Sequence, residues 1–120
     1  MPARFVILHH RFDDSEHWDL MIEHGEVLLT WQLLREPVDA ARLPIPARRI
    51  GDHRKAYLEY EGPVSGGRGT VRRVDAGTVE IEEQTRDQLR FRLAGSRLCG
   101  SFVLQRGEAQ DWTLANLPVP

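Results

Sequence analysis

The chain has 120 residues, a length at which a single domain with one hydrophobic core is the usual outcome. Apolar residues make up 41% of it and charged residues 28%, a balance that argues against a disordered chain. The formal net charge of −2 argues against a protein that binds nucleic acid simply by being basic. We therefore expect one domain over residues 1–120, with a flexible tail from about residue 116.

The apolar runs and the cysteine content predict a cytoplasmic protein. Runs such as residues 5–8 are far shorter than the roughly 20 residues that cross a bilayer, so we expect no membrane span. This run ends in histidines and acids instead of a small-residue cleavage site, so we expect no secretion signal. The one cysteine, Cys99, has no disulfide partner and no neighbouring base, and we expect its thiol to be buried and inert.

Short strands joined by turns are predicted for the first half of the sequence. The apolar run at residues 5–8 predicts a first strand. Residues 17–23 (HWDLMIE) alternate between two faces, which would carry His17 and Asp19 on the same side. A turn at Gly25 and a returning apolar segment make residues 17–34 a predicted β-hairpin. Residues 35–49 contain three prolines and predict a loop.

The second half continues the same pattern. The predicted elements are a short strand or turn at residues 56–60, a glycine-rich hairpin turn at 62–69, two short strands about an Asp-Ala-Gly turn in 70–83, a hairpin of strands 89–93 and 98–104, and a last strand around Trp112. Many short strands with glycine-containing turns predict a mostly β fold, namely a small antiparallel β-barrel or sandwich.

His10, His17 and Asp19 form the pattern HxxxxxxHxD, which is a candidate metal site. Two ligands at i and i+2 on a strand point to the same side, and His10 can arrive from the end of the neighbouring strand. Two imidazoles and one carboxylate suit manganese, zinc or ferrous iron and leave coordination positions open. The spacing alone fits two unrelated surface histidines as well, because HxD is a low-information pattern.

A second candidate site is the segment GDHRKAY, which contains His53 and Tyr57 among basic residues. A histidine, a tyrosine hydroxyl and the guanidinium of Arg54 would together make a phosphate pocket. A solvated basic loop explains the same residues. The neighbouring GPVSGGRG lacks the spacing of a phosphate-binding loop, so we interpret it as a turn.

Taken in order, these motifs resemble the 3′-phosphoesterase domain of bacterial DNA ligase D. FVILHH and HWDLMIEHGEVLLTWQL resemble that family's FVxxxH, HxDxxLE and SWxxP; GDHRKAYLEYEG resembles EDHxxDYxxFEG; VDAGT resembles WDxGT; and FRLAGSRLCGSFVLQR resembles FxLxGxxLxGxWxLxR. The resemblance covers nearly the whole chain, and it implies a small β-barrel enzyme that uses manganese to process 3′ ends in non-homologous end joining.

The resemblance also implies roles for individual residues. It implies metal binding by His10, His17 and Asp19, with manganese expected and zinc as an alternative. His53 and Tyr57 match a histidine and a tyrosine close to the scissile phosphate, and we expect them to be catalytic. For phosphate binding we expect the side chains of Arg35, which matches a family lysine, of His53 and of Arg54.

Three departures from the family pattern concern polar residues. In an ungapped comparison, Ile45 falls where the family has an arginine before the EDH segment. Met21 stands where the family has an arginine, and Leu8 stands where it has a glutamine. Methionine cannot replace the charge-assisted contacts that an arginine makes with phosphate. A second function therefore stays open beside the enzymatic one.

The sequence thus predicts a metal-dependent phosphoesterase, a hydrolase that acts on 3′ phosphate or ribonucleotide ends of DNA or RNA in DNA repair. A separate DNA ligase or polymerase is the partner that such a role implies. The alternative is a noncatalytic, metal-containing module that binds nucleic-acid ends or a repair partner.

Overall fold

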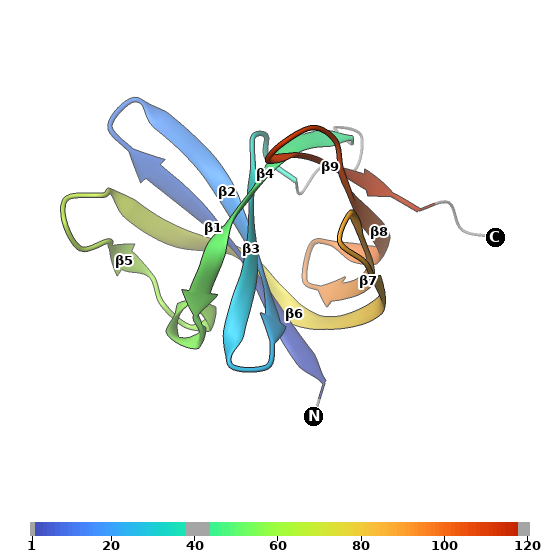
Figure 1. The fold of residues 1–120 in the computed structure, drawn as a ribbon. Helices are drawn as coiled ribbons and strands as arrows, with labels where there is room; N and C mark the ends of the chain where they lie inside the picture. Colours follow the sequence, from blue (N-terminus) through green and yellow to red (C-terminus); the bar gives the residue numbers. More distant parts are fainter. Residues whose placement is uncertain (1, 38–43, 118–120) are drawn as a thin grey trace.

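The computed structural model of the chain describes residues 2–37 and 44–117, and these residues form a closed antiparallel β-barrel (Figure 1). Its strands are β1 (Ala3–Phe12), β2 (Ser15–His24), β3 (Val27–Leu33), β4 (Ile45–Arg54), β5 (Gly62–Pro63), β6 (Thr70–Gln84), β7 (Gln88–Gly95), β8 (Cys99–Arg106) and β9 (Asp111–Asn116). A 3₁₀ helix, η2 (Lys55–Leu58), follows β4. The predicted fold class is confirmed.

The order of the strands explains how the barrel closes. Neighbouring strands follow the order β1-β2-β3-β4-β9-β8-β7-β6, and β1 also pairs with β6, so that eight strands form the barrel wall. The short β5 pairs with the start of β6. Figure 1 shows the β1–β2 hairpin and the start of β6 projecting together to one side of the barrel, with β5 beside them. Within residues 2–37 and 44–117, no helix is long and apolar enough to cross a membrane.

The local hairpin predictions are confirmed and several longer segments are corrected. The hairpins predicted at residues 17–34 and 89–104 are β2–β3 and β7–β8. The predicted loop at residues 35–49 is wrong at its end, where β4 begins with Ile45, and its residues 38–43 lie outside the described residues. Residues 56–60, predicted as a short strand or turn, contain most of a 3₁₀ helix. The tail predicted from about residue 116 lies mostly outside the described residues, which end at 117. Within them, β9 extends to Asn116, and the Leu117 N–H donates a hydrogen bond to the Ser101 carbonyl.

Residues 70–83 form one continuous strand, so the predicted turn at Asp75–Gly77 is wrong. Gly77 lies where the backbone of β7 comes close: a Cβ there would stand 2.1 Å from the Ala94 carbonyl oxygen. Asp75 is buried, and its carboxylate accepts hydrogen bonds from the backbone N–H groups of Ala76, Ser96, Arg97 and Leu98 at 2.8–3.2 Å. The Asp-Ala-Gly sequence therefore fixes the β7–β8 turn from a neighbouring strand.

The barrel has one core inside and a second on its outer face. The inner core takes alternate residues from all eight wall strands, for example Phe5, Leu20 and Phe91. The second, which we call the outer core, lies where η2 packs against β1. It consists of Val6, Leu8, Met21, Leu28, Leu58 and Val71, with Tyr57, Val64 and Ala76 packed against it. Because β1 and β2 are buried on both faces, their central residues are apolar without alternation.

The prediction for Cys99 is wrong, because its side chain is exposed. The preceding residue, Leu98, fills the inner core, and side chains that follow one another along a strand point to opposite faces. The Cys99 thiol donates a hydrogen bond to the Gly95 carbonyl at 3.1 Å.

Glu23, near the end of β2, joins three segments of the chain. Its carboxylate accepts a hydrogen bond from the Arg4 backbone N–H at 3.0 Å and lies 3.2 Å from the Lys55 ammonium and 3.8 Å from the Arg4 guanidinium. Partial burial raises the pKa of Glu23, but the Arg4 N–H and the two cations outweigh burial and hold the pKa below its usual value of 4.5. Ionised Glu23 therefore stabilises the folded state.

We expect Glu23→Gln to lower the free energy of unfolding by about 0.5–1 kcal/mol near neutral pH, as the loss of one charge-assisted bond predicts. A carboxyl whose pKa is lower in the folded state contributes fully above its unfolded pKa, and the contribution disappears as the pH falls through the folded pKa. The difference between variant and wild type should therefore close below pH 4.5. Urea unfolding across a pH series measures this, and a difference that is constant with pH would contradict it.

Candidate metal centre and phosphate site

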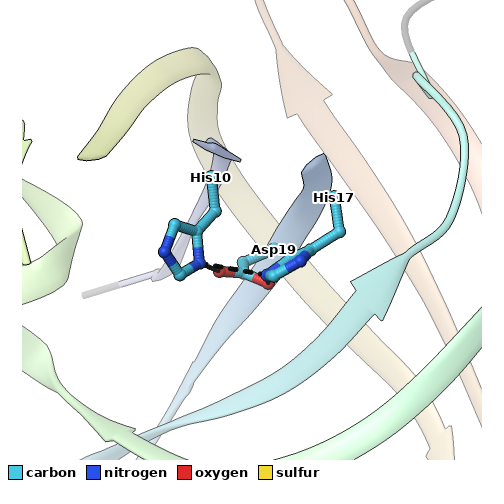
Figure 2. Close-up of side chains that lie close together, drawn as sticks. All are labelled: His10, His17 and Asp19. Atoms are coloured by element: carbon cyan, nitrogen blue, oxygen red, sulfur yellow. Dashed lines mark hydrogen bonds and ion pairs between the residues drawn. The ribbon is translucent and has the colours of Figure 1, made fainter. Parts of the chain in front are cut away.

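Two adjacent strands bring the predicted metal ligands together on the outer face of the barrel. His10 comes from β1, and His17 and Asp19 come from β2 (Figure 2). His10 Nδ1 lies 3.1 Å from His17 Nε2 and 3.7 Å from Asp19 Oδ2, and His17 Nε2 lies 3.0 Å from Asp19 Oδ1. One donor atom from each of the three residues lies within 4.8 Å of the donor atoms of the other two.

The register of the β1–β2 hairpin produces this convergence. His10 pairs with His17 across the hairpin, and Asp19 follows two residues later on the same face. The neighbouring residues His9 and Trp18 point to the other face of the hairpin, where their rings stack with their centroids 4.7 Å apart. A shift of one residue in either strand would separate the three donors.

The donor set fits a divalent metal ion. Asp19 is 3% exposed, and its Oδ1 has no hydrogen bond in the described part of the chain, since the short approach to His17 lacks hydrogen-bond geometry. His10 Nε2 lies 2.6 Å from the Arg68 carbonyl, which can only accept, so Nε2 carries the proton and Nδ1 presents its lone pair to the centre. A buried carboxylate oxygen without a hydrogen bond and two imidazole nitrogens thus face one point.

The hollow at the metal centre also contains the predicted phosphate-site residues His53 and Tyr57. Its volume is about 120 Å³, and its polar lining consists of His10, Asp19, His53, Tyr57 and Arg68. His53 lies opposite Leu28 in the β3–β4 pairing, and η2 then brings Tyr57 back, so that the two rings meet edge to face at 5.6 Å. The His53 Nδ1–H donates a hydrogen bond to the Gly51 carbonyl at 2.9 Å, so this contact does not use the other ring nitrogen, Nε2.

The arginines predicted to bind phosphate do not line this hollow. Arg35 donates a hydrogen bond to the Pro44 carbonyl at 2.7 Å. Arg54 lines a neighbouring hollow together with Tyr57 and Tyr60. Phosphate binding by Arg35 and Arg54 remains a prediction.

Arg68 is the residue of this hollow that sequence reasoning missed. Its guanidinium donates to the Ser65 carbonyl at 2.7 Å and approaches the Ser65 hydroxyl at 3.3 Å, and the residue is part of the lining of the hollow. The glycine-rich segment around it was interpreted as a turn, which the pairing of β5 with β6 confirms. What places this turn beside the metal centre is the β1–β6 pairing, in which His10 lies opposite Val71. Such a long-range pairing leaves no local signal in the sequence.

A polar row extends from the metal centre across the sheet. Gln32 on β3 lies opposite Asp19, and its amide nitrogen is 3.4 Å from His17 Nε2. Arg48 on β4 lies opposite Gln32, and residues directly opposite in a sheet project to the same face. An exposed guanidinium therefore stands two strands away from Asp19.

Two of the departures from the family pattern, Met21 and Leu8, lie together beneath the site. Met21 and Leu8 are both almost completely buried, and both belong to the outer core. Met21 also lines the hollow. The floor of this site is thus apolar, and the arginine among the residues that line the hollow is Arg68, which comes from a different segment.

Comparison with known proteins agrees with these observations. Residues 8–106 match the family described as the DNA Ligase D 3′-phosphoesterase domain. Similar relatives are the multifunctional non-homologous end joining protein LigD of Mycobacterium bovis and the multifunctional non-homologous end joining DNA repair protein LigD of Mycobacterium tuberculosis, each 28% identical over 115 residues. The match covers 90% of this chain but 15% of each relative. Since the match spans most of the chain and every residue of the candidate site, the chain belongs to the DNA ligase D 3′-phosphoesterase domain family.

Proposed function

We propose that this chain is a metal-dependent phosphoesterase that processes 3′ ends of nucleic acids in DNA end repair. The observation that carries the proposal is that His10 and Asp19, which cluster with His17, line one hollow together with His53, Tyr57 and Arg68. The names of both LigD relatives refer to non-homologous end joining, which supports a role at DNA ends. The chain spans 15% of those relatives, and we propose a DNA ligase or polymerase as the partner in this role.

His10, His17 and Asp19 would hold the metal ion, with manganese as our proposal and zinc as the alternative. When bound, such an ion supplies Lewis-acid polarisation of a phosphoryl oxygen and activation of water. The Arg68 carbonyl keeps the His10 ring oriented by accepting its Nε2–H. Such a backbone contact to a ligand is the usual means of fixing a metal-binding imidazole.

The remaining polar residues would act on the phosphate itself. The His53 ring is held by the bond from its Nδ1–H to the Gly51 carbonyl. In the doubly protonated form of the ring, Nε2 would donate a hydrogen bond to a phosphoryl oxygen or a proton to the leaving oxygen. The Tyr57 hydroxyl adds a second donor on the same side. Arg68 adds a fixed positive charge, which stabilises the negative charge that develops on phosphoryl oxygens during transfer.

Phosphate release tests this proposal. Purified protein would be incubated with manganese and a primer with a 3′-phosphate end, and in parallel with one that ends in a 3′-ribonucleotide. We expect release of phosphate from the first primer and of a nucleoside from the second, and loss of both activities when the metal is chelated.

Salt-dependent binding of the primer without turnover would instead favour the noncatalytic module, which the apolar Met21 and Leu8 beneath the site make a specific alternative. Absence of both binding and turnover would contradict the two functions together.

Arg68→Ala is expected to lower kcat/KM for phosphate release by roughly 10- to 100-fold, the usual cost of a lost charge-assisted bond to phosphate. The backbone carbonyl that orients His10 is kept in this variant, so metal binding should be unchanged. Initial rates over a range of substrate concentrations measure the effect. The matched control is Arg72→Ala, which removes an exposed arginine on β6. Its neighbour Val71 lines the hollow, so the Arg72 side chain projects from the opposite face of the strand. Equal rates for Arg68→Ala and wild type would exclude Arg68 from phosphate binding.

A further inference from the structure

A second hollow opens beside the metal centre. Its volume is about 310 Å³, at the lower end of the range in which proteins bind small molecules. Its lining consists of Arg54, Ala56, Tyr57, Tyr60, Pro63, Val64 and Ser65. Tyr57 and Val64 also line the hollow at the metal centre, so the two hollows share a wall.

Three aromatic rings lead from the metal centre into this second hollow. The rings of His53 and Tyr57 meet edge to face at 5.6 Å, and those of Tyr57 and Tyr60 do so at 5.7 Å. His53 lines the first hollow, Tyr60 lines the second, and Tyr57 lines both. The row of rings therefore connects the proposed phosphate site to a surface of aromatic and cationic character.

The ring of Tyr60 is held in place although it is 37% exposed. Its hydroxyl donates a short hydrogen bond to the Pro63 carbonyl. Gly62 between them has a φ of +132°, a conformation that L-residues rarely adopt, and a Cβ at this position would lie 3.4 Å from the Tyr60 hydroxyl. An exposed aromatic ring fixed from one edge is a preorganised stacking surface.

We propose that the second hollow binds the base of the nucleotide whose 3′ phosphate lies at the metal centre. This inference rests on the proposed function. Every nucleobase has a π-face that stacks on tyrosine, so the contact is tolerant of sequence. The exposed guanidinium of Arg54 at the same hollow is available to the negatively charged backbone of the strand. A metal-bound phosphate and a stacked base then fix the end of the strand at two points.

Oligonucleotides that differ only in the terminal base test this inference. Both carry a 3′ phosphate and a 5′ fluorophore, and the last nucleotide of one of them is abasic. With manganese present, we expect wild-type protein to bind the natural end about tenfold more tightly than the abasic end in fluorescence anisotropy. We expect Tyr60→Ala to remove this difference by weakening the natural end only, and Tyr60→Phe to retain it.

Two results would overturn the inference. One is equal affinity of wild-type protein for the two ends, which includes the case of no binding to either. The other is equal weakening of both ends by Tyr60→Ala, because it would show that Tyr60 only supports the packing of the site. A urea midpoint for each variant shows whether it is folded.

The same samples separate this inference from the proposed function. A base preference that depends on Tyr60, without phosphate release, would support base binding and contradict the esterase. Phosphate release that is equally fast from natural and abasic ends, with equal binding, would support the esterase and contradict base binding.

Discussion

Replacing His10 or Asp19 by alanine is expected to abolish manganese-dependent phosphate release, with kcat/KM falling by about a thousandfold or more. Each change removes one of the three donors that converge on a single point, and Asp19→Ala also removes the one carboxylate among them. Two remaining donors bind a divalent ion weakly, so the loss should appear in metal affinity as well as in rate. Isothermal titration with manganese and initial rates of phosphate release measure the two effects.

Controls for the metal ligands are available in the same strands. His24→Ala removes an exposed histidine at the end of β2 and should leave both the rate and the metal affinity unchanged. Asp19→Asn keeps the volume of the buried side chain, so it tests the loss of the charge with less risk of unfolding. If His10→Ala and Asp19→Asn both retained wild-type rates, the assignment of the metal centre would be wrong.

Asp75→Asn is expected to lower the free energy of unfolding by about 3 kcal/mol, a large part of the stability of a domain of this size. The carboxylate is buried and accepts hydrogen bonds from four backbone N–H groups, three of them in the β7–β8 turn. An amide would present two donors of its own toward these N–H groups. Asp75→Ala should cost at least as much, because it leaves all four N–H groups without this acceptor.

Urea unfolding measures the effect of Asp75, and an exposed aspartate provides the comparison. Asp87 lies 3.6 Å from the Arg106 guanidinium on the surface, so Asp87→Asn should change the free energy of unfolding by no more than about 0.5 kcal/mol. A similarly small effect of Asp75→Asn would show that the turn is held by other contacts. Gly95→Ala tests the same contact from the other side, because a Cβ at this position would lie 2.5 Å from Asp75 Oδ2 and 2.7 Å from Phe5 Cζ. We expect this substitution to lower the free energy of unfolding as well.

The apolar floor of the site contains two residues that differ in polarity from the family pattern, and both fit into the packed barrel. Leu8 and Met21 each stand where a polar residue is found in the family pattern, and both pack into the outer core. Because buried polar side chains need partners, a polar residue at either position would be poorly satisfied in this apolar floor. Positive charge at the proposed phosphate site would then come from another segment, such as the loop of Arg68.

Features that depend on neighbouring residues could be predicted from the order of amino acids alone. Alternation and turn residues were sufficient to predict the β2–β3 and β7–β8 hairpins, since both signals act over a few residues. The period of a strand placed His17 and Asp19 on one face. Spacing alone did not decide whether His10 would join them, and the family pattern was needed to favour it.

Features that depend on pairing between distant strands could not be predicted in this way and became visible in the folded barrel. Asp75 and Gly77 have the composition of a turn, yet β6 continues through them because β1 and β7 pair with it on either side. The same β1–β6 pairing brings Arg68 to His10, and the outward direction of Cys99 follows from Leu98 filling the inner core. In each case the deciding contact joins residues far apart in the chain, and local propensity carries no information about such contacts.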